Sequence, residues 1–320
     1  MAFSICWIAL EWYGLPILAA RELSPNASTS VFFSNDHPEA VLSLWFTALV
    51  FWSLGLADDY WQLAARYRLV AQILVIGLLI GFIWPELFQK LQTRLLQQSA
   101  ASPVELLPLW LIREYMSDSL VWIGAPMLLC LGLVFAVNAF NFMDGADGLA
   151  GFQAVFLLLA ASIFGRQNAL ILLLAVLVLV FIYFNFPPAR VFMGDAGSNL
   201  LGLILGCLYL EFFIQKPVVA ALLPAVFIAD VSVTLCRRIW RRQNFFRAHS
   251  EHAYQHLMRR IGHQKLAWVL ISLDLLLLCA AWLINQMHFV AVQIGLLGII
   301  YAALIGGALW LGAGTPRTQD

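Results

Sequence analysis

The sequence predicts an all-α fold, a polytopic membrane helix bundle with about ten transmembrane spans. Hydrophobic residues make up 62% of the 320-residue chain, charged residues make up 11%, and the mean hydropathy is +0.85. These values lie outside the range of ordinary soluble domains. Apolar runs of about 17–24 residues are long enough to cross a bilayer as helices. They fall at 2–20, 41–57, 68–85, 120–138, 149–165, 168–186, 198–214, 217–236, 266–285 and 288–311.

Charge and cysteine usage exclude several classes of protein. The net charge is zero, so no basic surface field indicates nucleic acid as a partner. The five cysteines lie singly in apolar runs, which predicts neither a disulfide framework nor a zinc site. The first residues lack a basic segment, so 2–20 is predicted to be a helix and not a signal peptide. We expect one integral membrane domain over 1–320 that contains a basic cytoplasmic loop at 237–265.

The distribution of Lys and Arg predicts the orientation of the spans. With the N-terminus inside, twelve of the 18 basic residues fall in cytoplasmic connections and six fall on the opposite side. Both termini are then cytoplasmic. Three polar clusters, at 58–59, 138–148 and 194–198, fall on the cytoplasmic face together with the basic loop. The lipid bilayer is therefore the expected surroundings, with a polar site at its cytoplasmic surface.

Carboxylates and amides at the ends of apolar runs are costly in hydrocarbon and are functional candidates for that reason. A site rich in carboxylates and amides, with few thiols, favours a hard cation such as Mg²⁺ or Mn²⁺. Mg²⁺ is commonly held by one or two carboxylates together with phosphate oxygens, which indicates a phosphorylated ligand.

Each cluster has a simpler alternative. Asp195 lies between Gly194 and Gly197 at the start of a predicted helix, where it is either part of a site or only an N-cap. Asp58 and Asp59 diverge by about 100° on a helix, so they are expected to have different partners or to form a solvated edge.

The 138–148 segment places its polar side chains three residues apart. On a helix this spacing gives one polar stripe, and the alternative is a polar turn between two spans. The members of the stripe are Asn138, Asn141, Asp144 and Asp147.

The basic loop carries three histidines at i, i+3 and i+7, which would share one helical face. Transition-metal binding is disfavoured by the neighbouring arginines, so a phosphate-binding surface fits better. The alternative is a basic segment that lies on anionic lipid headgroups. The residues concerned are Arg247, His249, His252 and His256. Asp230, inside the preceding span, is expected to form an ion pair or to extend toward the surface.

These residues together resemble a known family. The order is Asp58-Asp59, then Asn138-x-x-Asn141-x-x-Asp144-Gly-x-Asp147-Gly, then Phe192-x-Gly194-Asp195-x-Gly197-Ser198, then the His-rich basic loop. This set resembles the polyprenyl-phosphate N-acetylhexosamine-1-phosphate transferases of glycosyltransferase family 4. The segment around His252 and His256 is most similar to the O-antigen and surface-polysaccharide branch.

The resemblance implies a bacterial inner-membrane enzyme with its active site on the cytoplasmic face. Such enzymes move a sugar-1-phosphate from a UDP-N-acetylhexosamine to undecaprenyl phosphate and release UMP. The implied metal ligands for Mg²⁺ are Asp195 and Asn141, and the implied catalytic residues are Asp58, Asp59 and Asp144. The implied substrate-binding residues are Asn138, Asp147 for the nucleotide base, Ser198, and the loop residues Arg247, His249, His252 and His256. The resemblance leaves a homodimer open.

The sequence also departs from this family. Family members usually begin with a further span and a basic loop that ends in Gly-Gly, whereas Met1 here resembles the residues just after it. We therefore expect that the first span and its loop are missing, through a mis-assigned start or a truncation. Two other hypotheses stay open: an inactive truncated homologue, and a proton-coupled transporter.

Overall fold

The computed structural model describes residues 38–101, 118–165, 169–243 and 249–316, and these are helical, without a strand. The all-α prediction is confirmed. The helices are α2 (Pro38–Trp61), α3 (Ala65–Ala101), α5 (Asp118–Met143), α6 (Leu149–Phe164), α7 (Ala169–Asn185), α8 (Gly194–Gln215), α9 (Pro217–Leu222), α10 (Ala225–Trp240), α11 (Ala253–Ile261), α12 (His263–Asn285) and α13 (Val290–Leu311).

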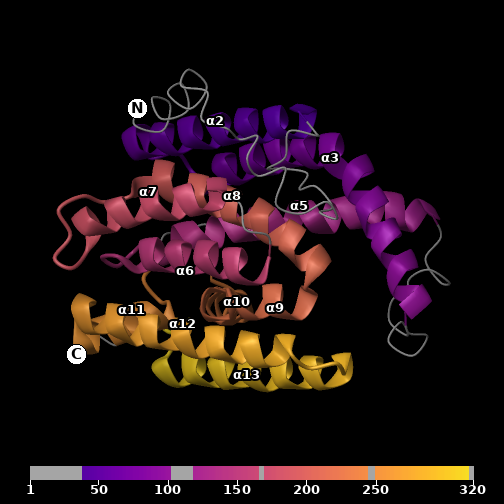
Figure 1. Ribbon diagram of the computed structural model, residues 1–320. Helices are drawn as coiled ribbons and strands as arrows, with labels where there is room; N and C mark the ends of the chain where they lie inside the picture. The colour runs from indigo at the N-terminus through magenta and orange to yellow at the C-terminus, as the bar shows by residue number, and fades with distance from the viewer. Residues whose placement is uncertain (1–37, 102–117, 166–168, 244–248, 317–320) are drawn as a thin grey trace.

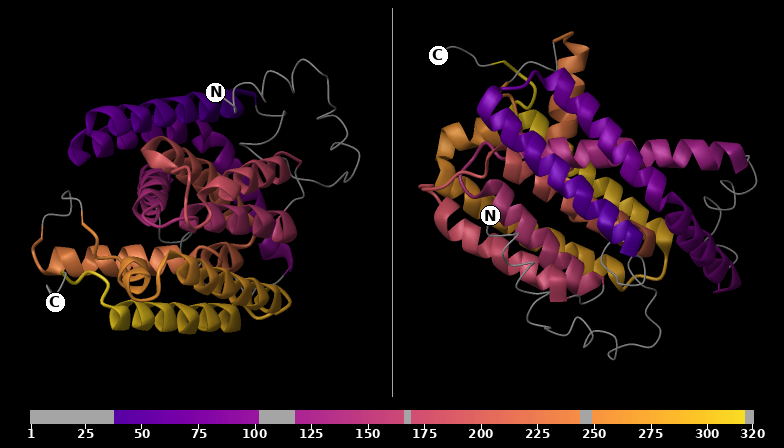
Figure 2. Two further views of the ribbon diagram at one scale, coloured as in Figure 1. Left: turned by 90° about the vertical axis from the view of Figure 1, so that its left-hand side faces the viewer. Right: turned by 90° about the horizontal axis from the view of Figure 1, so that it is seen from above.

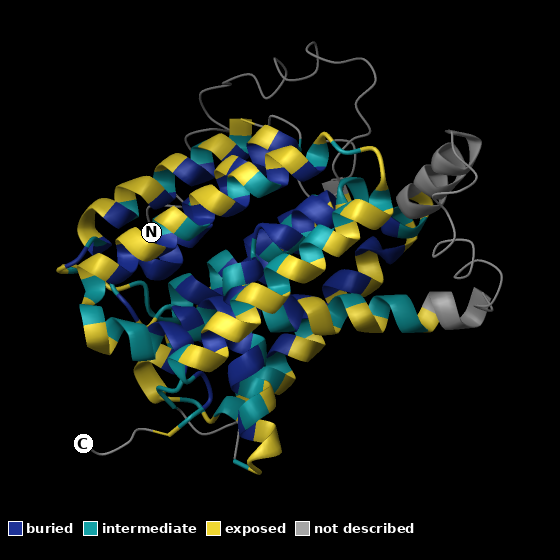
Figure 3. Cartoon of the chain, turned by 90° about the horizontal axis from the view of Figure 1, so that it is seen from below, coloured by how far each residue is buried: buried dark blue, intermediate teal, exposed yellow. Residues whose placement is uncertain are grey.

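Six of these helices are long and apolar enough to cross a membrane, and α6 and α7 are shorter apolar helices. The polytopic membrane class is therefore confirmed. The expected span 2–20 lies outside the described residues. Many large apolar side chains on these helices are exposed, as expected where lipid and not water surrounds the protein. Figure 3 shows exposed residues, in yellow, along the outer helices.

The expected single span at 217–236 is wrong. Pro224 has no backbone N–H and interrupts the helical ladder between α9 and α10. Figure 1 shows α10 nearly end-on, whereas the long helices run across the view. The chain therefore changes direction at Pro224, and α10 crosses the other helices.

The helices form three layers (Figure 1; Figure 2, left). The α2–α3 pair covers one side, α5 to α8 form the middle, and α10 to α13 cover the other side. Close approach of α8 to α2 and to α5 depends on glycines. A Cβ on Gly55 of α2 would lie 2.4 Å from Ala196 Cα of α8, and one on Gly202 of α8 would lie 2.8 Å from Val137 Cα of α5. Helix α8 is thus held directly against both α2 and α5.

The ends of the helices bring the predicted clusters together. Asp59 near the end of α2 contacts the start of α8, and Asn141 near the end of α5 contacts Asp195 in the first turn of α8. The start of α12 contacts the α5–α6 connection through His263 and Asp147. The prediction that the polar clusters share one face is confirmed.

Candidate active site

Asp59 holds the first turn of α8 from the neighbouring helix. Its carboxylate accepts hydrogen bonds from the backbone N–H of Asp195, at 2.9 Å, and of Ala196, at 3.3 Å. An anion is favoured there because the first N–H groups of a helix have no partner within it. Gly194 has a φ of 66°, and a Cβ on it would lie 2.9 Å from Asp59 Oδ2. Glycine is therefore required for this approach of α2 to α8.

Asp58 diverges from Asp59, as the sequence predicted. It is buried and forms an ion pair with Arg68 at the start of α3. The same Arg68 Nη1 lies 2.6 Å from Asp195 Oδ2. One guanidinium thus bridges the carboxylates of two helices, whose negative charges it partly neutralises. The role of Arg68 was missed by the sequence analysis, although a basic residue one turn into the next span after an acidic pair was an available signal.

Asn141 completes the contacts of Asp195. Its Nδ2 donates to Asp195 Oδ1 at 2.8 Å and to Ser198 Oγ at 3.1 Å. Asn138 does not join this group, because its Nδ2 donates to Gln72 Oε1 of α3 and to the carbonyl of Val134. The stripe expected over 138–147 is therefore divided: Asn141 faces α8, Asn138 faces α3, and Asp147 lies beyond the end of α5.

Asp144 faces the same cluster. Burial, together with the carboxylates of Asp195 and Asp59, raises its pKa to about 7. Four carboxylates therefore lie close to one another, and Arg68, which contacts two of them, leaves negative charge in excess. We name this group the acid cluster: Asp58, Asp59, Asp144 and Asp195, with Arg68 and Asn141.

The acid cluster could bind a hard divalent cation, because its donor atoms are carboxylate and amide oxygens. It presents carboxylate oxygens with uncompensated negative charge, and no thiol or imidazole is among the contacts described for it. Within the described part of the chain, no three His, Cys, Asp or Glu side chains form a ready ligand set. Mg²⁺ needs only one or two carboxylates when phosphate oxygens supply other ligands. Asp195 and Asp144 are the residues that could hold it. Each oxygen of Asp195 accepts one hydrogen bond and keeps a further lone pair, and Asp144 lines the pocket beside it.

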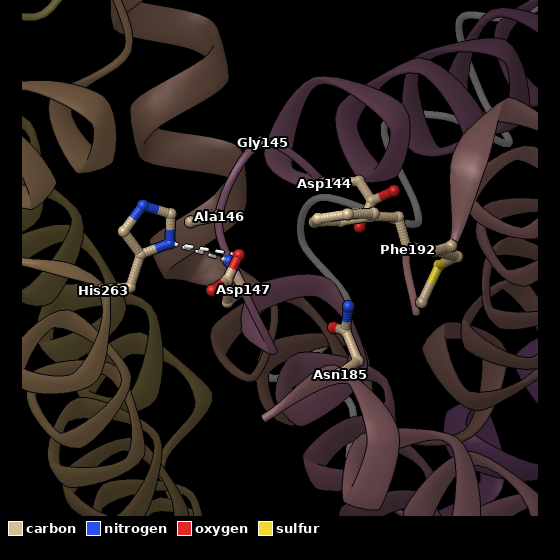
Figure 4. Close-up of a pocket in the computed structure, with 8 residues that line it drawn as sticks. Asp144, Gly145, Ala146, Asp147, Asn185, Phe192 and His263 are labelled. Carbon is tan, nitrogen blue, oxygen red and sulfur yellow. Dashed lines mark hydrogen bonds and ion pairs between the residues drawn. The ribbon is translucent and has the colours of Figure 1, made fainter. Parts of the chain in front are cut away.

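A pocket of about 320 Å³ lies beside the acid cluster, between the α5–α6 connection, the end of α7 and the starts of α8 and α12 (Figure 4). Its polar wall includes Asp144, Asp147, Asn185 and His263, and its apolar wall includes Phe192, whose side chain is 74% exposed. A pocket of this composition can receive a flat, polar ligand. Because Asp144 belongs to both the pocket and the acid cluster, one ligand could reach both.

The pocket's polar side chains are fixed by the α5–α6 and α7–α8 connections and by the start of α12. Asp147 Oδ2 accepts from the backbone N–H of Ala189, and Asp147 Oδ1 lies 3.2 Å from His263 Nδ1. Asn185 Oδ1 accepts from the N–H of Gly148 and its Nδ2 donates to the carbonyl of Val191. Asn185 and His263 were not among the residues predicted from the sequence. An amide at the end of an apolar run was a usable signal for Asn185, whereas His263 became meaningful only through its contact with Asp147.

The helical stripe of three histidines is wrong. Helix α11 begins at Ala253, so His256 lies in it, His252 is its N-cap with an extended backbone, and His249 precedes it. The helix begins there because the carboxylate of Asp230 accepts from the N–H groups of Ala253 and Tyr254. Arg247 lies outside the described residues.

The histidines also differ from charged phosphate ligands. Burial and the neighbouring His252 and Arg238 lower the pKa of His249 to about 4. Burial and Arg259 lower the pKa of His256. His252 is 2% exposed, and its Nδ1 lies 3.1 Å from Asp230 Oδ1. His249 and His256 are therefore neutral at pH 7, and His252 faces inward.

These residues nevertheless lie close to the acid cluster. The ring centroids of Phe142 and His249 are 6.3 Å apart, and Tyr254 Oη donates to the carbonyl of Phe142 at 2.9 Å. Phe142 is two residues before Asp144. The segment that contains His249 and Tyr254 thus contacts the end of α5, as expected if the basic loop and the polar clusters share one face.

Comparison with known proteins agrees with this arrangement. A sequence model of the family described as "Glycosyl transferase family 4" matches residues 41–213, more than half of the chain. The chain belongs to glycosyl transferase family 4. The matched region contains every residue of the acid cluster and most of the pocket, and it ends before the basic segment.

The chain is also similar to individual proteins that are named as sugar-phosphate transferases. It is 28% identical over 216 residues to a probable undecaprenyl-phosphate N-acetylglucosaminyl 1-phosphate transferase of Bacillus subtilis, covering 64% of the chain and 54% of that protein. It is 26% identical over 261 residues to the undecaprenyl-phosphate alpha-N-acetylglucosaminyl 1-phosphate transferase of Thermotoga maritima, covering 80% and 75%. It is 30% identical over 190 residues to the phospho-N-acetylmuramoyl-pentapeptide-transferase of Deinococcus radiodurans, covering 58% and 53%. The chain thus spans about half to three quarters of the length of these relatives.

Proposed function

We propose that this family 4 protein transfers an N-acetylhexosamine-1-phosphate from a UDP-sugar to undecaprenyl phosphate and releases UMP. The observation that carries the proposal is the meeting of Asp195, Asn141 and Arg68 at one end of the bundle, beside a pocket with which the cluster shares Asp144. The names of its relatives supply the substrate class. The setting we propose is the bacterial inner membrane, with the acid cluster at the cytoplasmic face of a single domain.

Mg²⁺, or Mn²⁺ in its place, is the cofactor we propose, held by Asp195 and Asp144 with Asn141 beside them. When bound, it would neutralise charge on the donor's diphosphate and on the departing UMP. The protein's own part is to keep these carboxylates in place: Asn141 orients Asp195, and Asp59 fixes the backbone of the same turn.

In the proposed reaction, an oxygen of the lipid phosphate forms a bond to the β-phosphorus of the UDP-sugar. The bond from that phosphorus to the bridging oxygen breaks, and its electron pair leaves with UMP. A lipid phosphate is already ionised near pH 7 and needs little help from a base. Asp58 and Asp59 therefore act through position and charge, Asp58 by holding Arg68 and Asp59 by holding α8.

The pocket is the proposed nucleotide subsite. Phe192 offers an exposed ring face for stacking, and Asp147 offers carboxylate oxygens to a base with N–H donors. Asp144 then stands toward the phosphate end. Ser198 is fully buried and accepts from Asn141, so it supports Asn141 from behind. The segment with His249 borders the remaining space for the sugar and diphosphate.

The transporter hypothesis is less well supported. It favours polar groups near the middle of spans, whereas the described clusters gather at helix ends.

The experiment is turnover of the purified full chain in detergent micelles with undecaprenyl phosphate, Mg²⁺ and a panel of UDP-N-acetylhexosamines. We expect UMP release with at least one donor, together with a lipid-linked sugar pyrophosphate. Folded protein that releases no UMP with any donor would favour the inactive homologue instead.

A further inference from the structure

Asp230 is a buried carboxylate that organises the basic segment. It lies on α10, is 5% exposed, and its oxygens lie within hydrogen-bond distance of four groups. The backbone N–H groups of Ala253 and Tyr254 donate to it at 2.9 Å, His252 Nδ1 lies at 3.1 Å, and Thr234 Oγ1 donates at 3.1 Å. The N-terminus of α11 is thus capped by a carboxylate from another helix.

His252 is held between this carboxylate and two rings. Because an ionised carboxylate can only accept, His252 must carry its proton on Nδ1 to bond Asp230. Its ring stacks on those of His249 and Tyr254, with centroids 5.1 Å and 5.8 Å away. Only 2% of the surface of His252 is exposed, so its ring is buried in the contact between α10 and the start of α11.

Tyr254 extends this contact to the end of α5. Its hydroxyl donates to the carbonyl of Phe142 at 2.9 Å. A Cβ on Gly145 would lie 2.2 Å from the same hydroxyl oxygen, so Tyr254 packs directly on this backbone. Phe142 and Gly145 flank Asp144. The position of Tyr254 therefore limits where the Asp144 carboxylate can stand.

We propose that Asp230, His252 and Tyr254 form a positioning chain that sets the place of Asp144 relative to Asp195. His252 acts through its Nδ1 contact with Asp230 and does not bind substrate. The inference rests on the proposed function, because Asp144 matters only if the acid cluster handles the donor's phosphates. It assigns Asp230, which lies outside the acid cluster and the pocket, to the same reaction.

The two nitrogens of His252 can be separated by substitution. In His252→Asn the amide nitrogen occupies about the place of Nδ1, whereas in His252→Gln it reaches about the place of Nε2. We expect His252→Asn to keep kcat within about threefold of the unchanged protein, and His252→Gln to lower it roughly tenfold or more, as for loss of a hydrogen bond to a charged group. The donor KM should change little in both. His252→Gln that is as active as His252→Asn, or more active, overturns the proposal.

Tyr254→Phe and Asp230→Asn test the ends of the chain. Tyr254→Phe removes only the hydroxyl on the Phe142 carbonyl, so we expect kcat to fall roughly three- to tenfold while α11 stays folded. Thr234→Val is the matched control, since it removes one donor to the same carboxylate and leaves α11 and α5 untouched. Wild-type kcat in Tyr254→Phe, or an equal loss in Thr234→Val, overturns the proposal.

Amide hydrogen exchange of the segment 252–258 provides a readout that needs no turnover. We expect faster exchange at Ala253 and Tyr254 in Asp230→Asn, and unchanged exchange in Thr234→Val and Tyr254→Phe. Unchanged exchange in Asp230→Asn overturns the proposal. If the unchanged protein releases no UMP while Asp230→Asn does exchange faster, the proposed function fails and the contact between α10 and α11 stands, with no reaction left for it to position.

Discussion

The acid cluster and the basic segment lie at the same end of the bundle but are built in opposite ways. The acid cluster joins helices distant in sequence, through Arg68 with Asp195 and Asn141 with Asp195, and its charge stays in excess. In the basic segment, residues 237–265, three arginines at the end of α10 are paired within the protein. Arg238 pairs with Glu251 at 2.9 Å, and Arg237 and Arg241 donate to the carbonyls of Ala313 and Gly314 after α13.

This difference separates residues that can handle a ligand from residues that hold the site together. Unsatisfied charge at the acid cluster favours a cation and a phosphorylated ligand. Arginines bonded to backbone carbonyls, and the partly buried His249 and His256, whose pKa values are lowered, have little charge left to offer. We therefore expect substitutions in the acid cluster to affect turnover most, and those in the described basic segment to act through position or stability.

The largest expected effect is that of Asp195→Asn. It removes a carboxylate that accepts from both Asn141 and Arg68, while the side-chain volume is nearly unchanged. We expect kcat to fall by more than roughly 100-fold, as for loss of a main electrostatic group. The measurement is UMP release, with membrane insertion and thermal unfolding as controls. Near-normal turnover in saturating Mg²⁺ would remove Asp195 from the site.

Substitution of Arg68 should have the next largest effect. Arg68→Met leaves Asp58 and Asp195 without their shared counter-charge, so we expect a loss of roughly 10- to 100-fold in kcat/KM. Arg68→Lys keeps the charge but not the fork that reaches two carboxylates, and should lose less. Arg66→Ala is the control, because the guanidinium of Arg66 lies over the ring of Tyr67 instead. Equal losses at Arg66 and Arg68 would contradict a specific role.

His263 lies on the pocket side of the site and should affect donor binding more than turnover. Its Nδ1 contacts both the carboxylate and the backbone N–H of Asp147. His263→Ala should raise the donor KM roughly three- to tenfold with a smaller change in kcat, because a group that orients a binding residue is lost. His263→Asn, which keeps a polar atom near Nδ1, should recover part of the loss. A fall confined to kcat would place His263 with the acid cluster instead.

The smallest expected effect on turnover is that of His249→Gln, and its main consequence is on stability. The pKa of His249 is lowered to about 4 in the folded protein, from about 6.5 unfolded, so the unfolded chain binds more protons between these values. Stability contributed by the neutral ring is therefore lost as the pH falls from about 6.5 toward 4. We expect His249→Gln to show a shallower loss of thermal stability over this range. A slope unchanged from that of the original protein would show that His249 is not the titrating group.

The carboxylates and the amide of the acid cluster could be predicted from the sequence because each is recognisable by its own position in the chain. Asp58-Asp59, Asn141, Asp144 and Asp195 each stand at the end of an apolar run, and the alternation of spans places those ends together. Their partner Arg68 was not predicted, because basic residues at the cytoplasmic ends of spans are common and usually only set the orientation of the spans.

The basic segment could not be predicted in the same way. Equal spacing of His249, His252 and His256 indicates one face only if the segment is helical throughout. The helix start is fixed by Asp230, 22 residues before His252, and such a long-range cap leaves no periodic signal. The break at Pro224 that separates α9 from α10 was visible, but the apolar run through it suggested one span.

The most direct test of the account is the dependence of UMP release on divalent cation. We expect turnover to vanish in excess EDTA, to return on addition of Mg²⁺, and not to return in Asp195→Asn at the same Mg²⁺ concentration. This result follows if the excess carboxylates of the acid cluster serve to hold a cation against the donor's diphosphate. Undiminished UMP release in EDTA would show that the reaction needs no divalent cation and that the acid cluster does not act by holding one.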